Sequence, residues 1–221
     1  MTANPGPPAT SRSPYQVVIV LLALVILGLA WYEHVSTTIS PRDELRKLGD
    51  VPPFALTERS GRPLTNNDLF GKIWVADFIF TTCPGPCPLV SASMAKVQKA
   101  TEHDPHVRLV TFTVDPQDDT PPVLAAYADH FGADPNRWFF LTGPEKPLYD
   151  LIENGFYQAV EDNRGHPLEE GQFIVTHSTR MVLVDENGVI RGFYDGINAE
   201  GRTDLLKGIR TLEKEEKEAG E

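Results

Sequence analysis

Cysteine is scarce in this chain, which has only Cys83 and Cys87 among its 221 residues. A zinc finger needs four ligands, and the sequence contains no second cysteine pair to supply them. Three interpretations of the two cysteines stay open: two buried apolar side chains, a structural disulfide, or a redox or metal site. Two cysteines fit a reducing compartment as well as a single redox pair outside the cytoplasm.

Positive charge is also in short supply, with 20 Lys and Arg residues against 31 Asp and Glu and a formal net charge of −11. This balance argues against nucleic acid as a partner. It is compatible with a basic protein partner, although negative charge usually serves solubility. The sequence has no internal repeats, and its length fits one ordinary domain with an appendage.

One apolar run, residues 15–32, contains no charged side chain. At about 1.5 Å per residue its 18 residues nearly span a bilayer core of ~30 Å. Tyr15, Trp31 and Tyr32 stand at its ends, as interfacial aromatic residues do. The run is longer than the core of a usual signal peptide, and no Ala-x-Ala-like cleavage site follows, which favours a retained transmembrane helix over a cleaved signal. No cysteine follows the run closely, which excludes a lipoprotein.

This anchor sets the expected organisation of the chain. Arg12 precedes the span and Glu33 follows it, so the positive-inside rule favours a cytoplasmic amino terminus and an exported domain. An exported domain is where a redox-active cysteine pair is expected. The expected segments are a disordered tail rich in Pro, Ser, Thr and Gly (1–14), the anchor (15–32), a juxtamembrane spacer (33–48), a globular domain (49–217) and a charged tail (218–221).

The two cysteines lie at a predicted strand-to-helix junction. The run Ile73–Phe80 is short, apolar and rich in β-branched and aromatic residues, as in a buried strand. Helical spacing begins after the stretch Thr81–Pro88. Pro88 suits the first position of a helix, which makes Cys87 the expected N-cap, with an extended backbone like that of Cys83. A thiol at the N-cap faces free N–H groups and the positive end of the helix dipole, which favours the thiolate form.

The remaining pattern alternates strands and helices. Such alternation, closed by a hairpin and a helix, predicts an α/β fold with a mixed sheet. The expected elements are a hairpin at 54–65, strands at 73–80, 107–114 and 138–141, helices at 89–100, 121–131 and 144–153, a hairpin at 180–194 and a final helix at 204–217.

The stretch Thr81–Pro88 reads Thr-x-Cys-Pro-x-x-Cys-Pro after an apolar strand, and it resembles the motif of the Sco/SenC family of membrane-anchored copper proteins. That family pairs the motif with Val-Asp-Pro downstream and with a histidine before a late strand. This chain has Val114–Pro116 and then His177 ahead of the run Met181–Val184, in the same order and spacing. Gly85-Pro86 between the cysteines departs from the acidic and aliphatic residues frequent in relatives. The resemblance implies a thioredoxin-like fold, a mixed central sheet flanked by helices.

The resemblance also implies a copper site made of Cys83, Cys87 and His177, in which the two cysteines form a redox-active disulfide pair. Two thiolates and one imidazole give a soft three-coordinate site, which suits Cu(I); Cu(II) would need an added oxygen ligand or water. The other histidines have no such support: His34, His103, His106, His130 and His166. Of these, His103 and His106 lie in a polar turn and are expected at the surface.

Asp115 follows a buried strand and precedes Pro116. It has two interpretations, a turn or cap carboxylate, or a group near the cysteines that takes part in docking or redox tuning. The acidic cluster of Asp115, Asp118 and Asp119 lacks the compact loop pattern of oxygen ligands that binds hard cations.

Two functions of different classes follow from the resemblance. The first is a copper chaperone on the outer, periplasmic face of the cell membrane. It would deliver copper to the binuclear site of cytochrome c oxidase and help assemble that site, with the oxidase's copper-bearing subunit as partner and another copper chaperone or a thiol reductant upstream. The second is an enzyme, a membrane-anchored thiol–disulfide oxidoreductase that keeps the client's copper-site cysteines reduced. The chain lacks both the Cys-x-x-Cys motif of thioredoxins and the Thr-x-x-Cys context of peroxiredoxins, which disfavours general oxidoreductase activity.

Overall fold

A computed structural model describes residues 15, 22–31, 45–162 and 175–219 of the chain. The chain divides into two compact units, with the boundary between Asp43 and Glu44. In the first unit, residues 22–31 are helical and exposed. No helix within the described ranges is long and apolar enough to cross a membrane. The other parts of the predicted anchor (16–21 and 32), the predicted tail (1–14) and most of the spacer (33–44) lie outside the described residues.

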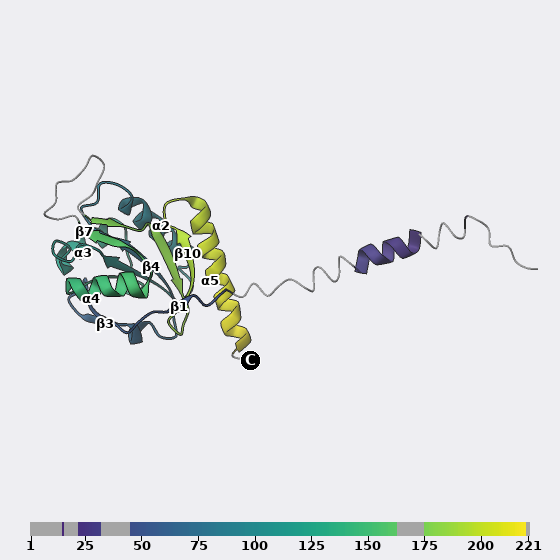
Figure 1. Ribbon diagram of the computed structural model, residues 1–221, viewed down its shortest axis with the longest axis horizontal. Coiled ribbons are helices and arrows are strands. Elements are labelled where there is room, and N and C mark those ends of the chain that lie inside the picture. Colours follow the sequence, from purple (N-terminus) through teal and green to yellow (C-terminus); the bar gives the residue numbers. More distant parts are fainter. Residues whose placement is uncertain (1–14, 16–21, 32–44, 163–174, 220–221) are drawn as a thin grey trace, which may run out of the picture. The chain divides into compact units, whose positions relative to one another are not determined.

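The second unit is built on an eight-stranded mixed sheet with the order β1-β10-β9-β4-β5-β6-β2-β3 (Figure 1). Central strand β4 pairs in parallel with β5, and β5 with β6, whereas the other neighbours in this sheet run antiparallel. The predicted mixed α/β fold is therefore confirmed. The strands are β1 (Gly49–Asp50), β2 (Ala55–Glu58), β3 (Pro63–Thr65), β4 (Ile73–Ile79), β5 (Val107–Thr113), β6 (Trp138–Thr142), β9 (Arg180–Val184) and β10 (Val189–Asp195).

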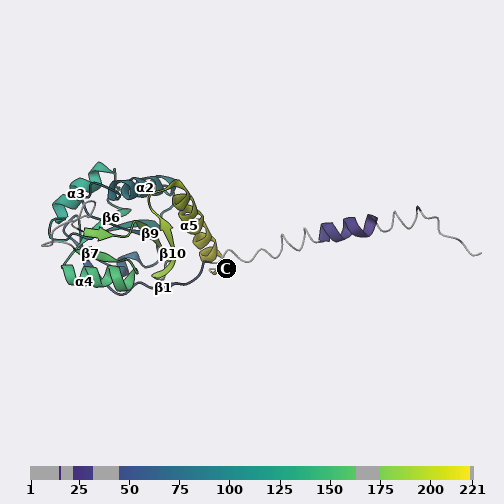
Figure 2. The same ribbon diagram turned by 45° about the horizontal axis from the view of Figure 1, so that its top comes forward.

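Helices cover both faces of this sheet, and Figure 2 shows α2 and α3 on one side and α4 on the other. A short antiparallel pair, β7 and β8, lies outside the main sheet. The remaining elements are η1 (Asn66–Leu69), α2 (Cys87–Ala100), α3 (Pro121–His130), α4 (Glu145–Asp150), the π-helical turn η2 (Leu151–Gly155), β7 (Val160–Asp162), β8 (Val175–His177) and α5 (Ala199–Ala219).

Two helices differ from the sequence prediction. The helix expected at 144–153 is divided into α4 and the π-helical turn η2. The final helix begins at Ala199 rather than Asp204, because the Asn198 side chain accepts a hydrogen bond from the Gly201 N–H at 2.7 Å and caps an earlier start. The helical periodicity of the apolar residues begins only at Leu205, so it gave no sign of this extra turn.

Strand β4 is held inside the core, and this fixes the position of the cysteine loop that follows it. All seven of its residues are buried. Phe78 of β4 and Phe112 of β5 pack against Phe156, which follows η2, with ring centroids 5.3 and 5.1 Å from the Phe156 ring. Because side chains alternate along a strand, Asp77 points to the opposite face from Phe78, the face covered by α2. The aromatic layer therefore holds β4 rigidly from one side, up to the point where the cysteine loop begins.

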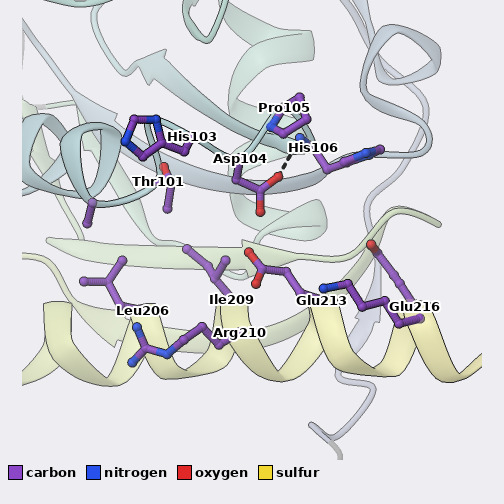
Figure 3. Close-up of a pocket in the computed structure, with 12 residues that line it drawn as sticks. Thr101, His103, Asp104, Pro105, His106, Leu206, Ile209, Arg210, Glu213 and Glu216 are labelled. Carbon is purple, nitrogen blue, oxygen red and sulfur yellow. Dashed lines mark hydrogen bonds between the residues drawn. The ribbon is translucent and has the colours of Figure 1, made fainter.

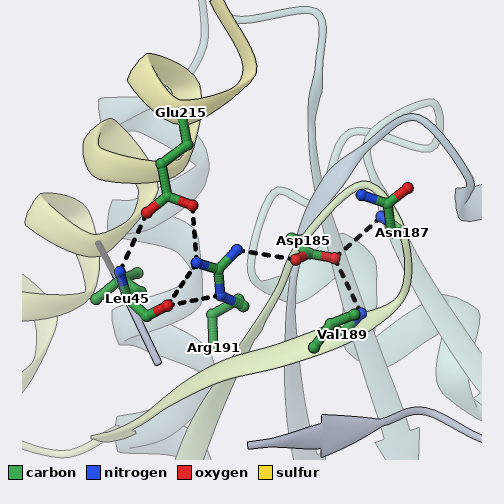
Figure 4. A network of polar contacts seen from close by, with 6 residues as sticks. All are labelled: Leu45, Asp185, Asn187, Val189, Arg191 and Glu215. Carbon is green, nitrogen blue, oxygen red and sulfur yellow. Dashed lines mark hydrogen bonds and ion pairs between the residues drawn. The ribbon is translucent and has the colours of Figure 1, made fainter. Parts of the chain in front are cut away.

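The described part of the second unit begins at a polar clamp (Figure 4). Buried Arg191 of β10 donates to the Leu45 carbonyl at 2.5 and 3.1 Å, to Asp185 at 2.9 Å and to Glu215 of α5 at 2.7 Å. Glu215 accepts the Leu45 N–H at 3.1 Å, so both backbone groups of Leu45 are bound. Asp185 also accepts two backbone N–H groups of the β9–β10 turn at 2.9 and 3.0 Å. The clamp thus ties the entering chain to β10 and to α5.

Candidate functional site

Cys83 and Cys87 lie at the carboxyl end of β4, in the connection to α2, as predicted. Neither forms a disulfide in this structure, and both are buried, Cys83 being 6% exposed and Cys87 0%. The Cys83 N–H donates to the Phe80 carbonyl at 3.2 Å, and the Val90 N–H donates to the Pro86 carbonyl at 3.1 Å at the start of the helix. The site therefore sits where ligands commonly bind in open α/β sheets, outside the carboxyl ends of the strands.

Helix α2 begins one residue earlier than the prolines suggested. Its N-cap is Pro86, Cys87 is its first residue and Pro88 is its second. The prediction of an extended, N-capping Cys87 is therefore wrong. Pro86 has φ −74° and ψ −27°, so the fixed φ of proline already matches a helix and allows it to start at once. Pro88 is tolerated there because the N–H groups of the first turn have no helical partner.

Cys83, rather than Cys87, is the acidic thiol. The Cys87 thiol donates to the Cys83 sulfur and lowers the pKa of Cys83 to about 6, assisted by the backbone N–H groups of Cys87 and Gly85 and opposed by burial. The same side-chain hydrogen bond raises the pKa of Cys87, and burial raises it further. These two effects outweigh the Phe80 backbone N–H, which lowers the pKa of Cys87, so the direction is opposite to the predicted thiolate at Cys87. At neutral pH the pair holds a thiolate on Cys83 and a thiol on Cys87.

We expect iodoacetamide to modify Cys83 before Cys87 in the reduced, metal-free chain. Because the thiolate is the nucleophile and the pKa of Cys83 is lowered to about 6, the rate should rise between roughly pH 5 and pH 7 and then level off. Peptide mass spectrometry of the labelled chain identifies the modified residue. Preferential labelling of Cys87, or a rate that rises only above about pH 8 as for an ordinary thiol, would contradict the assignment.

A buried carboxylate, Asp77, lies in β4 before the cysteine loop. It is 0% exposed, and its Oδ1 accepts the Thr111 hydroxyl at 2.5 Å while that hydroxyl accepts the Trp138 indole N–H at 2.8 Å. Its Oδ2 has no hydrogen-bond partner among the described residues. Burial raises the pKa of Asp77 to about 7, and negative charge on Asp77 contributes to the raised pKa of Cys87. Sequence analysis missed Asp77, although a lone carboxylate inside an apolar strand was a visible signal.

The carboxylate in direct contact with the cysteine loop is Asp119. It accepts the Thr81 N–H at 3.1 Å, the Thr81 hydroxyl at 2.5 Å and the Thr113 hydroxyl at 2.5 Å. Asp115, the predicted candidate, is buried at the end of β5. Its N–H donates to the Thr113 hydroxyl and its carbonyl accepts the Asp119 N–H, both at 2.9 Å. Asp115 thus shapes the turn that presents Asp119, and its predicted part in docking or redox tuning stays a prediction.

His177 is the last residue of β8, and its backbone pairs with Val160 of β7. Its side chain lies outside the description, so its role as the third copper ligand stays a prediction. Within the described ranges, no group of three or more His, Cys, Asp or Glu side chains could hold a metal ion. His103, His106 and His130 are exposed, which confirms the predicted surface position of His103 and His106. Two more, His34 and His166, lie outside the described residues.

A separate cavity of about 630 Å³ lies between the turn 101–106 and α5 (Figure 3). Its lining includes Asp104 and Glu213, which share a hydrogen bond; burial, followed by this bond, raises the pKa of Glu213 to about 7. The turn leads into the amino end of β5, whereas the cysteines follow the carboxyl end of the parallel strand β4. The cavity therefore belongs to the opposite end of the sheet and adds nothing to the cysteine site.

Comparison with known proteins finds one family over most of the chain. Residues 43–212 match the SCO1/SenC family model. A SCO1/SenC family lipoprotein from Bacillus anthracis str. Ames is 35% identical, with a TM-score of 0.68 over 76% of this chain and 99% of that chain. BsSco, described as having a disulfide switch and as a member of the Sco family of cytochrome c oxidase assembly proteins, is 28% identical, with a TM-score of 0.66 over 77% and 98%. Bradyrhizobium japonicum ScoI with copper bound is 25% identical, with a TM-score of 0.59 over 72% and 98%. These likenesses confirm the thioredoxin-like fold.

Proposed function

Because the chain belongs to the SCO1/SenC family, we propose that it is a copper-binding chaperone that delivers copper to the binuclear copper site of cytochrome c oxidase and helps assemble that site. The observation that carries the proposal is the buried pair of thiols at the β4–α2 junction, one of them acidic. The copper-bound ScoI from Bradyrhizobium japonicum and the description of BsSco as an assembly protein support it. The proposed client is the copper-bearing subunit of the oxidase.

The donor set fits copper as cargo. Cys83 supplies a thiolate at neutral pH, and binding of Cu(I) would displace the proton of Cys87 and so provide a second thiolate. Thiolate sulfur is the ligand type that selects Cu(I), and burial of both cysteines limits access of water to the metal. We propose His177 as the third ligand. Cu(II) would use the same ligands with an added oxygen donor.

A second candidate function is reduction of the client's copper-site disulfide, and the acidic Cys83 thiol favours it. The Cys83 thiolate would attack one client sulfur, form a mixed disulfide and release the other client sulfur as a thiolate. Deprotonated Cys87 would then attack the Cys83 sulfur, leaving a Cys83–Cys87 disulfide and a second client thiolate. Two electrons pass from the chain to the client. Copper content after purification, measured alongside insulin reduction, separates the two functions, since a chaperone retains copper and a general reductase turns over insulin.

We expect each of three single substitutions, Cys83→Ser, Cys87→Ser and His177→Ala, to raise the Cu(I) dissociation constant of the reduced chain. Loss of an outer group around a metal typically costs 10–100-fold in affinity, so loss of a ligand should cost more than about 100-fold. Competition with a Cu(I) chelator measures the change. The matched control is His130→Ala, which should stay within about twofold because His130 is exposed at the end of α3. Equal losses in His130→Ala and His177→Ala would contradict the ligand assignment.

We further propose that residues 15–32 form a retained anchor and that the folded unit lies on the periplasmic face. The uncharged apolar run supports this, and the Bacillus anthracis relative is described as a lipoprotein. A reporter that is active only in the cytoplasm, fused after Glu221, should be silent. Amino-terminal sequencing that finds the mature chain starting after Tyr32 would overturn the anchor.

A further inference from the structure

We propose that Asp119 is a positioning residue for the copper site, because its buried carboxylate fixes Thr81 and thereby sets the direction in which the cysteine loop leaves β4. This inference deepens the proposed function and rests on it, since it concerns the same pair of cysteines.

The carboxylate of Asp119 is fully committed to this contact. Asp119 is 1% exposed, and it accepts three hydrogen bonds, two from Thr81 and one from Thr113, at 2.5 to 3.1 Å. No Lys or Arg pairs with it among the described residues. A buried charge without a cation is tolerated only when hydrogen-bond donors replace the lost water. Asp119 therefore needs these three donors to stay buried, and the donors of Thr81 and Thr113 would lose their acceptor without Asp119.

The contact lies where the main sheet stops supporting β4. The last paired residues of β4 and β5 are Ile79 and Thr113, and the final ladder bond runs from the Val114 N–H to the Ile79 carbonyl at 2.8 Å. The Asp119 contact lies at Thr81, two residues beyond this last paired residue of β4. Asp119 continues the link, because it binds Thr113 on one strand and Thr81 on the other. It thus joins the two central strands through side chains just ahead of Cys83.

The turn that carries Asp119 is itself held in place. The Asp115 N–H binds the Thr113 hydroxyl, and the Asp119 N–H binds the Asp115 carbonyl, each at 2.9 Å. The hydrogen bonds that lower the pKa of Cys83 come from Gly85 and Cys87, which follow it in the chain. The Asp119–Thr81 contact, in turn, fixes the segment that precedes Cys83. Since a metal site is degraded by displacements of about 0.5 Å, loosening this contact should weaken copper binding without removing a ligand.

Four variants of the purified full-length chain test the proposal. In Asp119→Asn, loss of charge-assisted hydrogen bonds should raise the Cu(I) dissociation constant at least about tenfold. It should also shift the Cys83–Cys87 dithiol–disulfide equilibrium against glutathione at least about fivefold toward the disulfide, because the contact is present in the dithiol form and is proposed to stabilise that form. Thr81→Val removes the hydroxyl bond and keeps the Thr81 N–H bond, so it should produce both changes in the same direction. Thr81→Ser keeps the hydroxyl and should stay within about twofold of wild type, as should the matched control Asp118→Asn, whose side chain is exposed.

The double variant Asp119→Asn/Thr81→Val should bind Cu(I) no more weakly than Asp119→Asn alone, because the Thr81 hydroxyl bond that Thr81→Val removes is one of the bonds that Asp119→Asn already weakens. Additive losses of Cu(I) affinity in the double variant would overturn the proposal. So would an Asp119→Asn chain whose Cu(I) dissociation constant and dithiol–disulfide equilibrium both stay within about twofold of wild type. If that chain were also less stable to heat, Asp119 would have a structural role only. If Asp119→Asn does not fold, the comparison of Thr81→Val with Thr81→Ser decides alone. If the wild-type chain binds no Cu(I), the proposed function fails, while the dithiol–disulfide equilibrium still decides the role of Asp119.

Discussion

Replacing Arg191 by methionine is expected to lower the free energy of unfolding by about 3–5 kcal/mol, the cost of breaking a buried ion pair by removing one partner. Arg191 is buried and bound to Asp185 at 2.9 Å and Glu215 at 2.7 Å. Methionine fills much of the same space and offers no donor. The Asp185 carboxylate would keep its turn N–H partners but lose its cation, and the Leu45 carbonyl would lose both of its guanidinium bonds.

Urea unfolding of the two chains measures this difference. The matched control is Lys207→Met, which breaks the exposed Lys207–Asp204 pair at 2.8 Å and should cost no more than about 1 kcal/mol. The second variant Arg191→Met/Asp185→Asn removes the stranded charge and should recover part of the loss. A cost below about 1 kcal/mol for Arg191→Met would show that the clamp does not stabilise the fold.

Replacing Asp77 by asparagine should make the difference in stability from wild type depend on pH by about 4 kcal/mol in total. Folded Asp77 keeps its proton up to a pKa of about 7, whereas the unfolded chain releases it near 3.8. Between these values unfolding releases a proton, so the wild type loses stability as pH rises. The two pKa values differ by about 3, and each pKa unit corresponds to about 1.36 kcal/mol, which gives about 4 kcal/mol. Above about pH 7 the wild type bears the whole of this cost.

The asparagine cannot ionise, so this loss disappears in the variant. At about pH 4 the variant should be the less stable protein, by about 1–3 kcal/mol, because its amide nitrogen takes the place of Oδ2, which has no partner among the described residues. At about pH 8 it should equal or exceed the wild type. Urea unfolding at both pH values measures the change, with exposed Asp118→Asn as control. A stability difference that is the same at both pH values would show that Asp77 titrates normally.

The sequence was sufficient for features that depend on local pattern. The apolar run before the cysteines became β4, because a buried parallel strand needs apolar side chains on both faces. The Asp185–Gly188 turn formed the predicted hairpin, with Gly188 at φ +81°, a conformation that glycine adopts without steric cost. Helix boundaries were less readable, since Pro86 and Asn198 each allow a start before the apolar periodicity begins.

The electrostatics of the site could not be derived from local pattern. Which cysteine is acidic depends first on the direction of the hydrogen bond between the two sulfurs and then on where the loop N–H groups point, and the order of the prolines specifies neither. Asp119 and Thr81 meet only because β4 and β5 pair in parallel, so no spacing in the sequence marks their contact. The family resemblance directed attention to Asp115, whereas the carboxylate in contact with the loop is Asp119.

Titration of Cu(I) into the fully oxidised chain, with a competing chelator present and loss of free thiol confirmed, tests most directly whether the cysteine pair is the copper site. In a Cys83–Cys87 disulfide neither sulfur is a thiolate, so the metal loses its two strongest ligands. The oxidised chain is expected to bind little Cu(I), and reduction is expected to restore a stoichiometric site. Tight one-to-one binding of Cu(I) by the oxidised chain would show that the copper site lies elsewhere.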